Sequence, residues 1–195
     1  MTQLFALLLA WLLSACAQTP TAHFYQLVAL SPIAPAVPTT AKPRSIGIGP
    51  VTLPSLSDRE EMVTLGIGNS VDIAPFQRWA APLKANIVQV LQQNMARQLP
   101  NDLLRSYPWS AFGDVDQHIV IEITRFDASL GNTVTLEANW AVMDDASRQP
   151  LKSGHSLISQ ALPDASYSAS AFAFSQALQQ MGAELVRAVK ATNAR

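Results

Sequence analysis

The amino-acid sequence predicts an α+β fold in which a mainly antiparallel sheet packs with two amphipathic helices in a single domain. Two stretches carry an apolar residue every three or four positions, the period of an amphipathic helix. Between them, two stretches alternate apolar and polar residues with the period of a half-buried strand. Strands covered by separate helices are typical of an α+β layer arrangement.

Composition limits the classes of function. The chain has 195 residues, enough for one domain and a leader. Only 14% of its residues are charged, against roughly 25% in an average soluble domain. The net charge of −1 argues against nucleic acid as a partner, because phosphate binding needs a basic face. It also argues against a purely electrostatic attachment to membranes.

The first fifteen residues have the pattern of a signal peptide. Leu4–Leu13 is an unbroken apolar run that is shorter than the roughly 20 residues of a membrane-spanning helix. The following Leu13-Ser14-Ala15-Cys16 resembles the bacterial lipobox, which implies cleavage before Cys16 and acylation of its thiol and amine. Ala17, rather than Asp, favours sorting to the outer membrane. The alternative is a buried apolar strand or helix followed by an ordinary cysteine.

These patterns divide the chain into three parts. Residues 1–15 are the expected signal peptide, 16–22 a lipidated tether, and 23–195 the folded domain. The six tether residues after Cys16 reach about 20 Å at most, so the domain is expected close to the membrane. Cys16 is the only cysteine, so an acylated mature chain has no disulfide and no thiol nucleophile.

Two strands and a proline-rich crossover are expected at the start of the domain. Residues 23–29 mix aromatic and aliphatic side chains and predict a first strand. Residues 31–43 contain four prolines; we interpret them as an intradomain crossover rather than a linker. Residues 44–53 predict a second strand, in which Pro50 requires an edge or a bulge. Its expected core positions are Ile46, Ile48 and Val51.

A short hairpin and the first helix follow. Residues 62–67 and 71–74 are predicted strands joined by Gly68-Asn69-Ser70. We expect Arg78-Trp79-Ala80-Ala81-Pro82 to open the helix, with Pro82 at its first position. The apolar positions of this helix are Leu83, Ile87, Val90, Leu91, Met95 and Leu99.

The second half of the chain contains the clearest hairpin. After a loop carrying Tyr107-Pro108-Trp109, residues 118–127 and 133–143 alternate and are joined by a turn at Gly131-Asn132. Residues 151–161 are a weaker strand, expected near a sheet edge. The last helix is predicted from six apolar positions: Ala171, Phe174, Leu178, Met181, Leu185 and Val189.

No catalytic or metal-binding motif is present in the sequence. It has neither a Gly-x-Ser-x-Gly elbow nor a Ser-x-x-Lys motif. His23, His118 and His155 each fall on a predicted strand without a second histidine at metal-ligand spacing, which is typical of surface or edge histidines. We therefore expect no enzyme, no metal site and no cofactor other than an acyl lipid on Cys16.

Four residues stand out as candidates for contact with a partner. Asp58 and Arg59 precede the short hairpin, and Arg78 and Trp79 precede the helix. In the structural interpretation, Asp58 caps a turn, an arginine pairs with it, and Trp79 closes the core. In the functional interpretation they bind a protein partner, because Arg and Trp are favoured interface anchors. The two interpretations are compatible.

The mature chain resembles the PqiC/YmbA family, the auxiliary lipoproteins of ABC-type lipid transport systems. The lipobox at Cys16 is one matching element. The others are Phe24-Tyr25-x-Leu27, Gly49-Pro50-Val51-x-Leu53-Pro54, Asp58-Arg59, Met62-Val63, Arg78-Trp79-Ala80-x-Pro82-Leu83, Phe126-Asp127, Trp140 and the serine-rich last helix. The chain departs from the family at Leu56-Ser57, where an aromatic residue and Leu are common, and at Ala81, where Glu is common.

The resemblance implies a noncatalytic lipoprotein, anchored in the outer membrane and facing the periplasm. It would dock the outer end of an MCE-domain protein that spans the periplasm and works with an inner-membrane transport component. A structural lipoprotein of another cell-envelope assembly complex is the alternative, and a periplasmic hydrolase is a weaker one. The sequence leaves open whether the domain forms a homo-oligomer or binds lipid itself.

Overall fold

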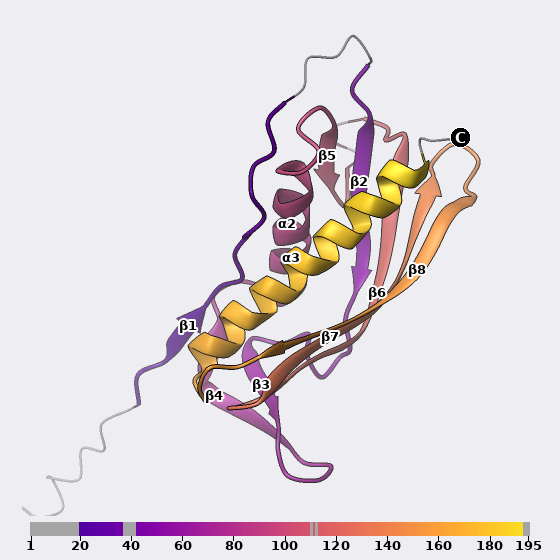
Figure 1. Cartoon of the computed structure of the whole chain (residues 1–195). Helices are drawn as coiled ribbons and strands as arrows, with labels where there is room; N and C mark the ends of the chain where they lie inside the picture. The colour runs from indigo at the N-terminus through magenta and orange to yellow at the C-terminus, as the bar shows by residue number, and fades with distance from the viewer. Residues whose placement is uncertain (1–19, 37–41, 110, 112, 193–195) are drawn as a thin grey trace, which may run out of the picture.

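The computed structural model describes residues 20–36, 42–109, 111 and 113–192. The expected signal peptide and Cys16 lie outside these ranges. Within them, eight strands form two sheets and two helices pack beside them (Figure 1). The helices are α2 (Leu83–Ala96) and α3 (Tyr167–Thr192). The strands are β1 (His23–Tyr25), β2 (Ser45–Thr52), β3 (Glu61–Leu65), β4 (Val71–Trp79), β5 (Leu103–Ser106), β6 (Gln117–Ser129), β7 (Thr133–Asp144) and β8 (Pro150–Ala161).

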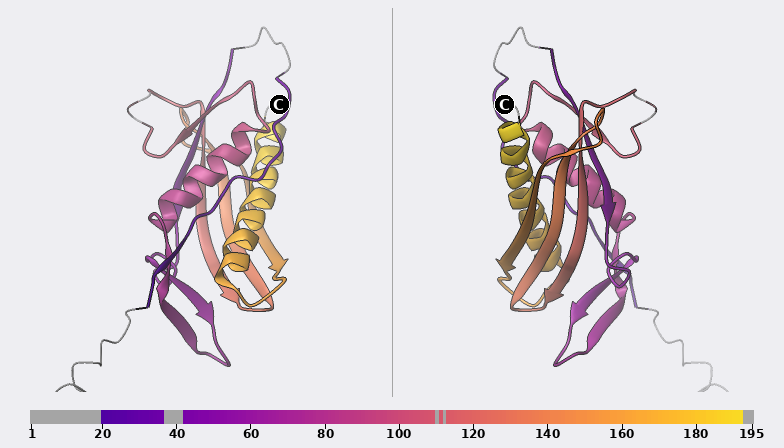
Figure 2. Two further views of the ribbon diagram at one scale, coloured as in Figure 1. Left: turned by 90° about the vertical axis from the view of Figure 1, so that its left-hand side faces the viewer. Right: turned by 90° about the vertical axis from the view of Figure 1, so that its right-hand side faces the viewer.

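A five-stranded sheet and both helices form the body of the domain. The strand order is β5-β2-β6-β7-β8, with the long antiparallel ladders β6–β7 and β7–β8 on one side. Strand β2 runs parallel to both of its neighbours, β5 and β6. Helix α2 packs on β2 and β5 and α3 on β7 and β8, and the helices touch each other on one face of the sheet (Figure 2). The predicted α+β fold is confirmed.

The predicted apolar positions form the core. The six positions expected in α2 and its following turn are all buried, as are the six expected in α3. Ile46, Ile48 and Val51 of β2 are buried as well. Pro50 lies at a break in the register between β2 and β6, so β2 is a central strand with a bulge rather than an edge. Strand β8 is at the sheet edge, as its weak pattern indicated.

Strand β5 and the parallel pairings were not predicted. Residues 103–106 were assigned to a loop, but the backbone N–H of Leu103 donates to the carbonyl of Arg44 at 2.7 Å. The Arg44 side chain also pairs with Asp102, which holds the start of β5 beside β2. A four-residue strand with one exposed leucine has little periodicity of its own. Its strand character therefore comes from this tertiary partner.

The loop after β5 covers the sheet face opposite the helices. The ring of Trp109 lies 5.5 Å from that of His118 and 5.4 Å from that of Tyr107, measured between centroids. A Cβ atom on Gly47 would lie 2.7 Å from the Trp109 ring, so glycine is required there for this close approach. His118 is consequently buried in a central strand, and the expectation that it lies at the surface or an edge was wrong.

An extended segment after β1 is clamped against the two helices. Predicted strand 23–29 ends at Tyr25, and the chain then runs along α2 without pairing as a strand (Figure 1). Asn86 accepts from the backbone N–H of Leu27 at 2.9 Å and donates to its carbonyl at 3.3 Å. Asn94 accepts from the N–H groups of Leu30 and Ser31. Within the predicted crossover, the backbone N–H of Ala34 donates to the carbonyl of Arg97 at 2.6 Å, so this described part lies against the end of α2, as expected of an intradomain crossover.

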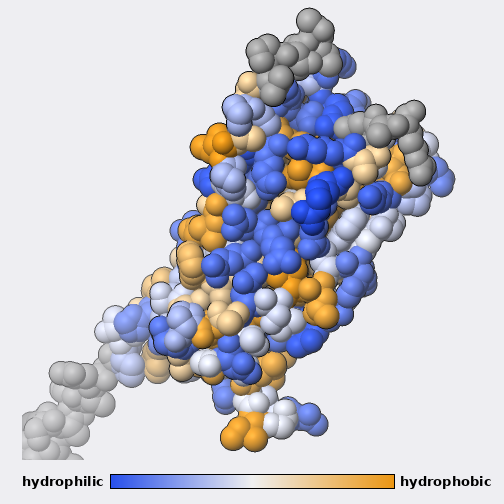
Figure 3. Space-filling view, viewed as in Figure 1, coloured by the Kyte–Doolittle hydropathy of each residue, from blue (hydrophilic) through white to orange (hydrophobic). Residues whose placement is uncertain are grey.

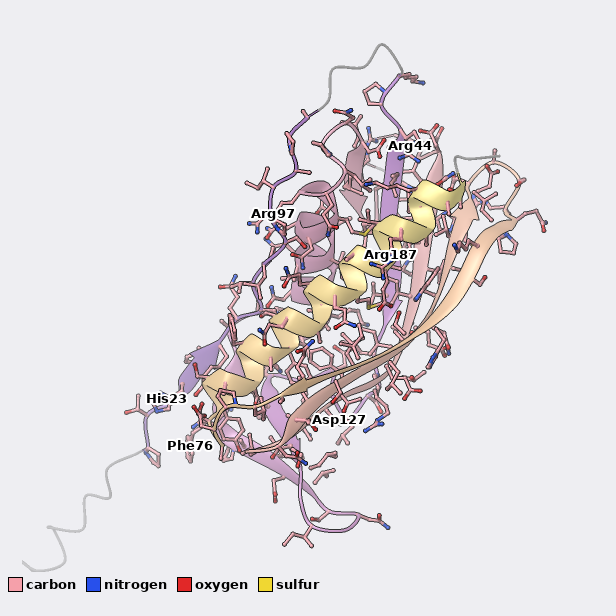
Figure 4. The ribbon with its side chains drawn as sticks, viewed as in Figure 1. His23, Arg44, Phe76, Arg97, Asp127 and Arg187 are labelled. Atoms are coloured by element: carbon pink, nitrogen blue, oxygen red, sulfur yellow. The ribbon has the colours of Figure 1, made fainter. Side chains whose placement is uncertain are left out.

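Arginine and serine side chains complete this clamp. Arg97 donates to the carbonyls of Ala29 and Ser31, and it lies beside the extended segment in Figure 4. The hydroxyl of Ser175 on α3 accepts from the N–H of Val28 at 3.1 Å. Side chains thus replace the strand partners that the segment lacks, satisfying its backbone groups.

None of the helices in the described ranges has the length and apolarity to cross a membrane.

We expect Asn86→Ala to destabilise the domain by about 2 kcal/mol, because both backbone groups of Leu27 lose their partner in a buried place. The free energy of unfolding from urea titration measures the loss. The control is Asn69→Ala in an exposed turn, which should change it by less than about 0.5 kcal/mol. Equal effects of the two substitutions would contradict a clamping role for Asn86.

Candidate functional site

The four candidate residues meet at one corner of the domain, where β1, β4 and the start of α2 come together. Strand β1 pairs in parallel with β4, so that Phe24 lies beside Arg78. The backbone N–H of Trp79 donates to the carbonyl of Glu60 at 2.7 Å, which brings the loop before β3 to the same place. Arg78 and Trp79 therefore end a strand, and the expectation that they open the helix was wrong.

The reason for that error is the three-stranded sheet. Strand β4 was predicted to stop at residue 74, but it continues to Trp79 because β1 supplies a second partner for residues 77–79. The sheet order is β1-β4-β3. Helix α2 begins only at Leu83, with Pro82 as its N-cap residue. The apolar run at residues 71–74 does not predict this pairing, because its partner β1 lies about fifty residues earlier in the chain.

Six charged side chains form what we call the charged corner: Asp58, Arg59, Glu60, Glu61, Arg78 and Lys84. Asp58 pairs with Lys84 at 3.2 Å, and Arg59 pairs with Glu61 at 2.9 Å. Arg78 lies 3.5 Å from Glu60 and 3.9 Å from Glu61. The hypothesis that an arginine pairs with Asp58 was wrong, because the first turn of α2 places Lys84 there instead. The corner has three acidic and three basic groups and is formally neutral.

Trp79 lies beneath the charged corner as part of the core. Its side chain is only 6% exposed and meets Phe174 of α3 edge to face, with ring centroids 6.3 Å apart. Phe174 in turn stacks on Phe126 of β6 at 4.0 Å. Large aromatic side chains contribute much of a core's apolar contact area. The predicted core-closing position of Trp79 is confirmed.

An open groove of about 400 Å³ runs across this corner. Its walls combine charged groups with the exposed ring of Phe24, which is 63% accessible. The floor includes buried Trp79. The lining residues are Phe24, Asp58, Arg59, Glu60, Trp79, Ala80, Ala81, Pro82 and Leu83. Three of the four sequence candidates line the groove, and Arg78 flanks it through its pair with Glu60.

The electrostatics of the corner centre on Glu61. A hydrogen bond from Arg59 holds the pKa of the Glu61 carboxyl below its ordinary value of 4.5, and its own backbone N–H and the charges of Arg59 and Arg78 act in the same direction. Glu61 therefore stays ionised and keeps both guanidinium groups beside the groove. Its neighbour Glu60 is 77% exposed at the side chain and projects into solvent.

Sequence reasoning missed three members of the charged corner: Glu60, Glu61 and Lys84. Glu60 and Glu61 are not among the candidates that the sequence predicts, and Glu61 is the first residue of β3. Lys84 was not considered. The signal that could have identified them is the run of acidic and basic residues at 58–61, followed by Arg78 and Lys84. The remaining histidines do not add a site: His155 pairs with Glu137 at 3.0 Å on an exposed face.

The described residues contain no group of three or more His, Cys, Asp and Glu side chains placed to hold a metal ion. What the corner offers is an uneven surface with paired charges around an aromatic and aliphatic floor. Fold and site together define an α+β domain with a candidate contact surface.

The chain belongs to the ABC-type transport auxiliary lipoprotein component family, whose model matches residues 25–186. This match confirms the resemblance to auxiliary lipoproteins recognised in the sequence. No curated protein matches the chain. The family assignment covers almost all of the domain, including the charged corner, helix α2 and most of α3.

Two solved structures show the same fold. Protein XCC0632 from Xanthomonas campestris is 18% identical, with a TM-score of 0.71 over 89% of this chain and 97% of that one. A crystal structure of an uncharacterized protein is 19% identical, with a TM-score of 0.72 over 87% of this chain and 99% of that one. At these identities the likeness concerns the fold alone.

We expect Glu61→Gln to destabilise the domain more at pH 7 than at pH 3. The carboxyl's pKa is lowered by folding, so its contribution is present above 4.5 and is lost as the pH falls through the depressed value. Urea unfolding at both pH values measures this. Glu60→Gln, at a far more exposed carboxyl, is the control. An equal loss at both pH values would indicate packing rather than charge.

Proposed function

We propose that this protein is a noncatalytic outer-membrane lipoprotein of an intermembrane lipid transport system. Its domain faces the periplasm and docks the outer end of a periplasm-spanning MCE protein, which works with an inner-membrane transport component. The observation that carries the proposal is the family match over residues 25–186, because the members of this family are lipoproteins that act as auxiliary components of ABC-type transport. The lipobox at Cys16 supports the anchor, and Ala17 supports the outer membrane.

The groove at the charged corner is the proposed docking site. Ion pairs that are partly exposed contribute only about 0–1 kcal/mol each, so a partner can exchange them for contacts of its own at low cost. Arg59 and Arg78 supply planar groups that bind carboxylates in a fixed geometry. Phe24, which is mostly exposed, and the floor at Trp79 supply apolar area. Charged rims around an apolar centre are the usual anatomy of protein interfaces.

The anchor and the short tether fit this role. A single acyl chain gives marginal membrane binding, whereas two or more give stable attachment, so a fully acylated Cys16 would hold the domain firmly. A structural lipoprotein of another envelope assembly complex is the alternative. Copurification of an MCE protein, or of lipid, with the membrane-extracted protein separates the two. Recovery of a different envelope complex without an MCE protein would contradict the transport role.

We expect Cys16→Ser to release the protein from the outer membrane, because the acylated residue is lost. Membrane fractionation and labelling with radioactive palmitate measure location and acylation together. Ser14→Ala, which leaves the acceptor cysteine in place, is the control and should remain acylated. Continued outer-membrane location of Cys16→Ser without label would contradict the lipid anchor.

We expect Arg78→Ala and Arg59→Ala each to weaken copurification of the partner by about tenfold, the size of effect that removal of an interface anchor produces. Their unfolding free energies should change by less than about 1 kcal/mol, because partly exposed ion pairs contribute little. Arg187→Ala, on an exposed part of α3, is the matched control (Figure 4). If either corner substitution only unfolds the domain, the corner is structural.

A further inference from the structure

The β3–β4 hairpin displays an apolar face to solvent. Its register places Val63 opposite Ile73 and Leu65 opposite Val71, so these four side chains share one face. Leu65 and Val71 are each 40% exposed and Ile73 is 44% exposed, and Ile67 at the turn is 98% exposed. In Figure 3 the lower end of the molecule, where the turn projects in Figure 1, carries a hydrophobic group at its lowest point, beside white and blue residues.

This hairpin is nearly free of charge. Between Met62 and Gln77 the only charged residue is Asp72, which lies opposite Thr64 and therefore on the other face. The charged corner begins where the hairpin ends, at Glu61 and Arg78. The hairpin thus changes from charged at its base to uncharged at its tip, where Ile67 is almost fully exposed, and such a gradient suits entry into a less polar phase.

The chain before β1 leaves the domain on the side of this tip. Strand β4 runs from the turn toward the body, and β1 pairs with its last residues in the same direction, His23 with Gln77 and Tyr25 with Trp79. Residues that precede a strand parallel to β4 leave toward the beginning of β4, where the turn is. Figure 4 shows His23 and Phe76 together at the lower end of the molecule, away from Arg44.

The length of β4 and the reach of the tether before β1 agree with this direction. From Gln77 back to Val71 a strand covers about 20 Å, at roughly 3.3 Å per residue. The six residues between Cys16 and β1 reach about 20 Å when extended. An acyl group on Cys16 therefore reaches the level of the hairpin turn and little farther, so that membrane and turn are brought together.

We propose that the apolar face and turn of the β3–β4 hairpin, with Ile67 at the tip, insert into the lipid surface to which Cys16 is anchored. This inference rests on the proposed lipidation. The occupant is lipid, rather than a second protein chain, because the tether directs this end of the domain to the membrane. Two attachment points then set the orientation of the domain and hold the charged corner about one hairpin length above the lipid.

The test uses the absence of any cysteine other than Cys16. Ile67→Cys in the full-length, acylated protein is labelled with the polarity-sensitive fluorophore NBD and reconstituted into phosphatidylethanolamine–phosphatidylglycerol vesicles. Ile33→Cys is the matched control, because Ile33 is 80% exposed but follows the clamped segment beside Arg97. Vesicle flotation and mass spectrometry first establish that each protein is acylated and bound.

At position 67 we expect a blue shift of NBD emission on reconstitution and loss of emission when spin-labelled lipids are included; at position 33 we expect neither. A water-like spectrum at position 67 in protein that is acylated and floats would overturn this inference and leave the anchor intact. A blue shift without quenching by spin-labelled lipids would also overturn it, by showing that protein covers the hairpin. Failure of acylation or flotation would instead overturn the proposed anchor.

Discussion

The contact of Trp79 with Phe174, and of Phe174 with Phe126, joins the two sheets of this domain. Trp79 ends the three-stranded sheet, Phe174 belongs to α3, and Phe126 lies in the five-stranded sheet. One buried aromatic cluster therefore fixes the small sheet against the body. The β3–β4 hairpin and most of the charged corner are carried by that small sheet, so their positions depend on this contact and on the packing of β3 against β6.

A second constraint connects the tether to the body. Residues 26–36 form no strand, and side chains of both helices bind the backbone of this segment instead. Asn86 and Asn94 are polar residues on the buried face of α2, where an apolar side chain would pack more simply. The side-chain oxygens of both residues, which accept from the backbone of the segment, and the amide N–H of Asn86, which donates to the carbonyl of Leu27, explain the exception.

The proposed docking and membrane contacts lie at opposite ends of the same strand. Strand β4 carries the apolar turn at its beginning and Arg78 at its end. An anchored domain oriented by the turn would present the groove away from the lipid, toward a partner in the periplasm. The length of β4 sets this separation, because its nine extended residues lie between the hairpin turn and the groove.

The sequence by itself determined the class of fold, both helices, the β6–β7 hairpin and the candidate residues Asp58, Arg59, Arg78 and Trp79, because periodicity and residue type are local properties. Only the tertiary structure decided that Lys84, rather than an arginine, meets Asp58, and that β4 extends to Trp79. It also decided that β5 is a strand and that Trp109 buries His118 over Gly47. These features depend on partners far away in the chain, which a local pattern does not encode.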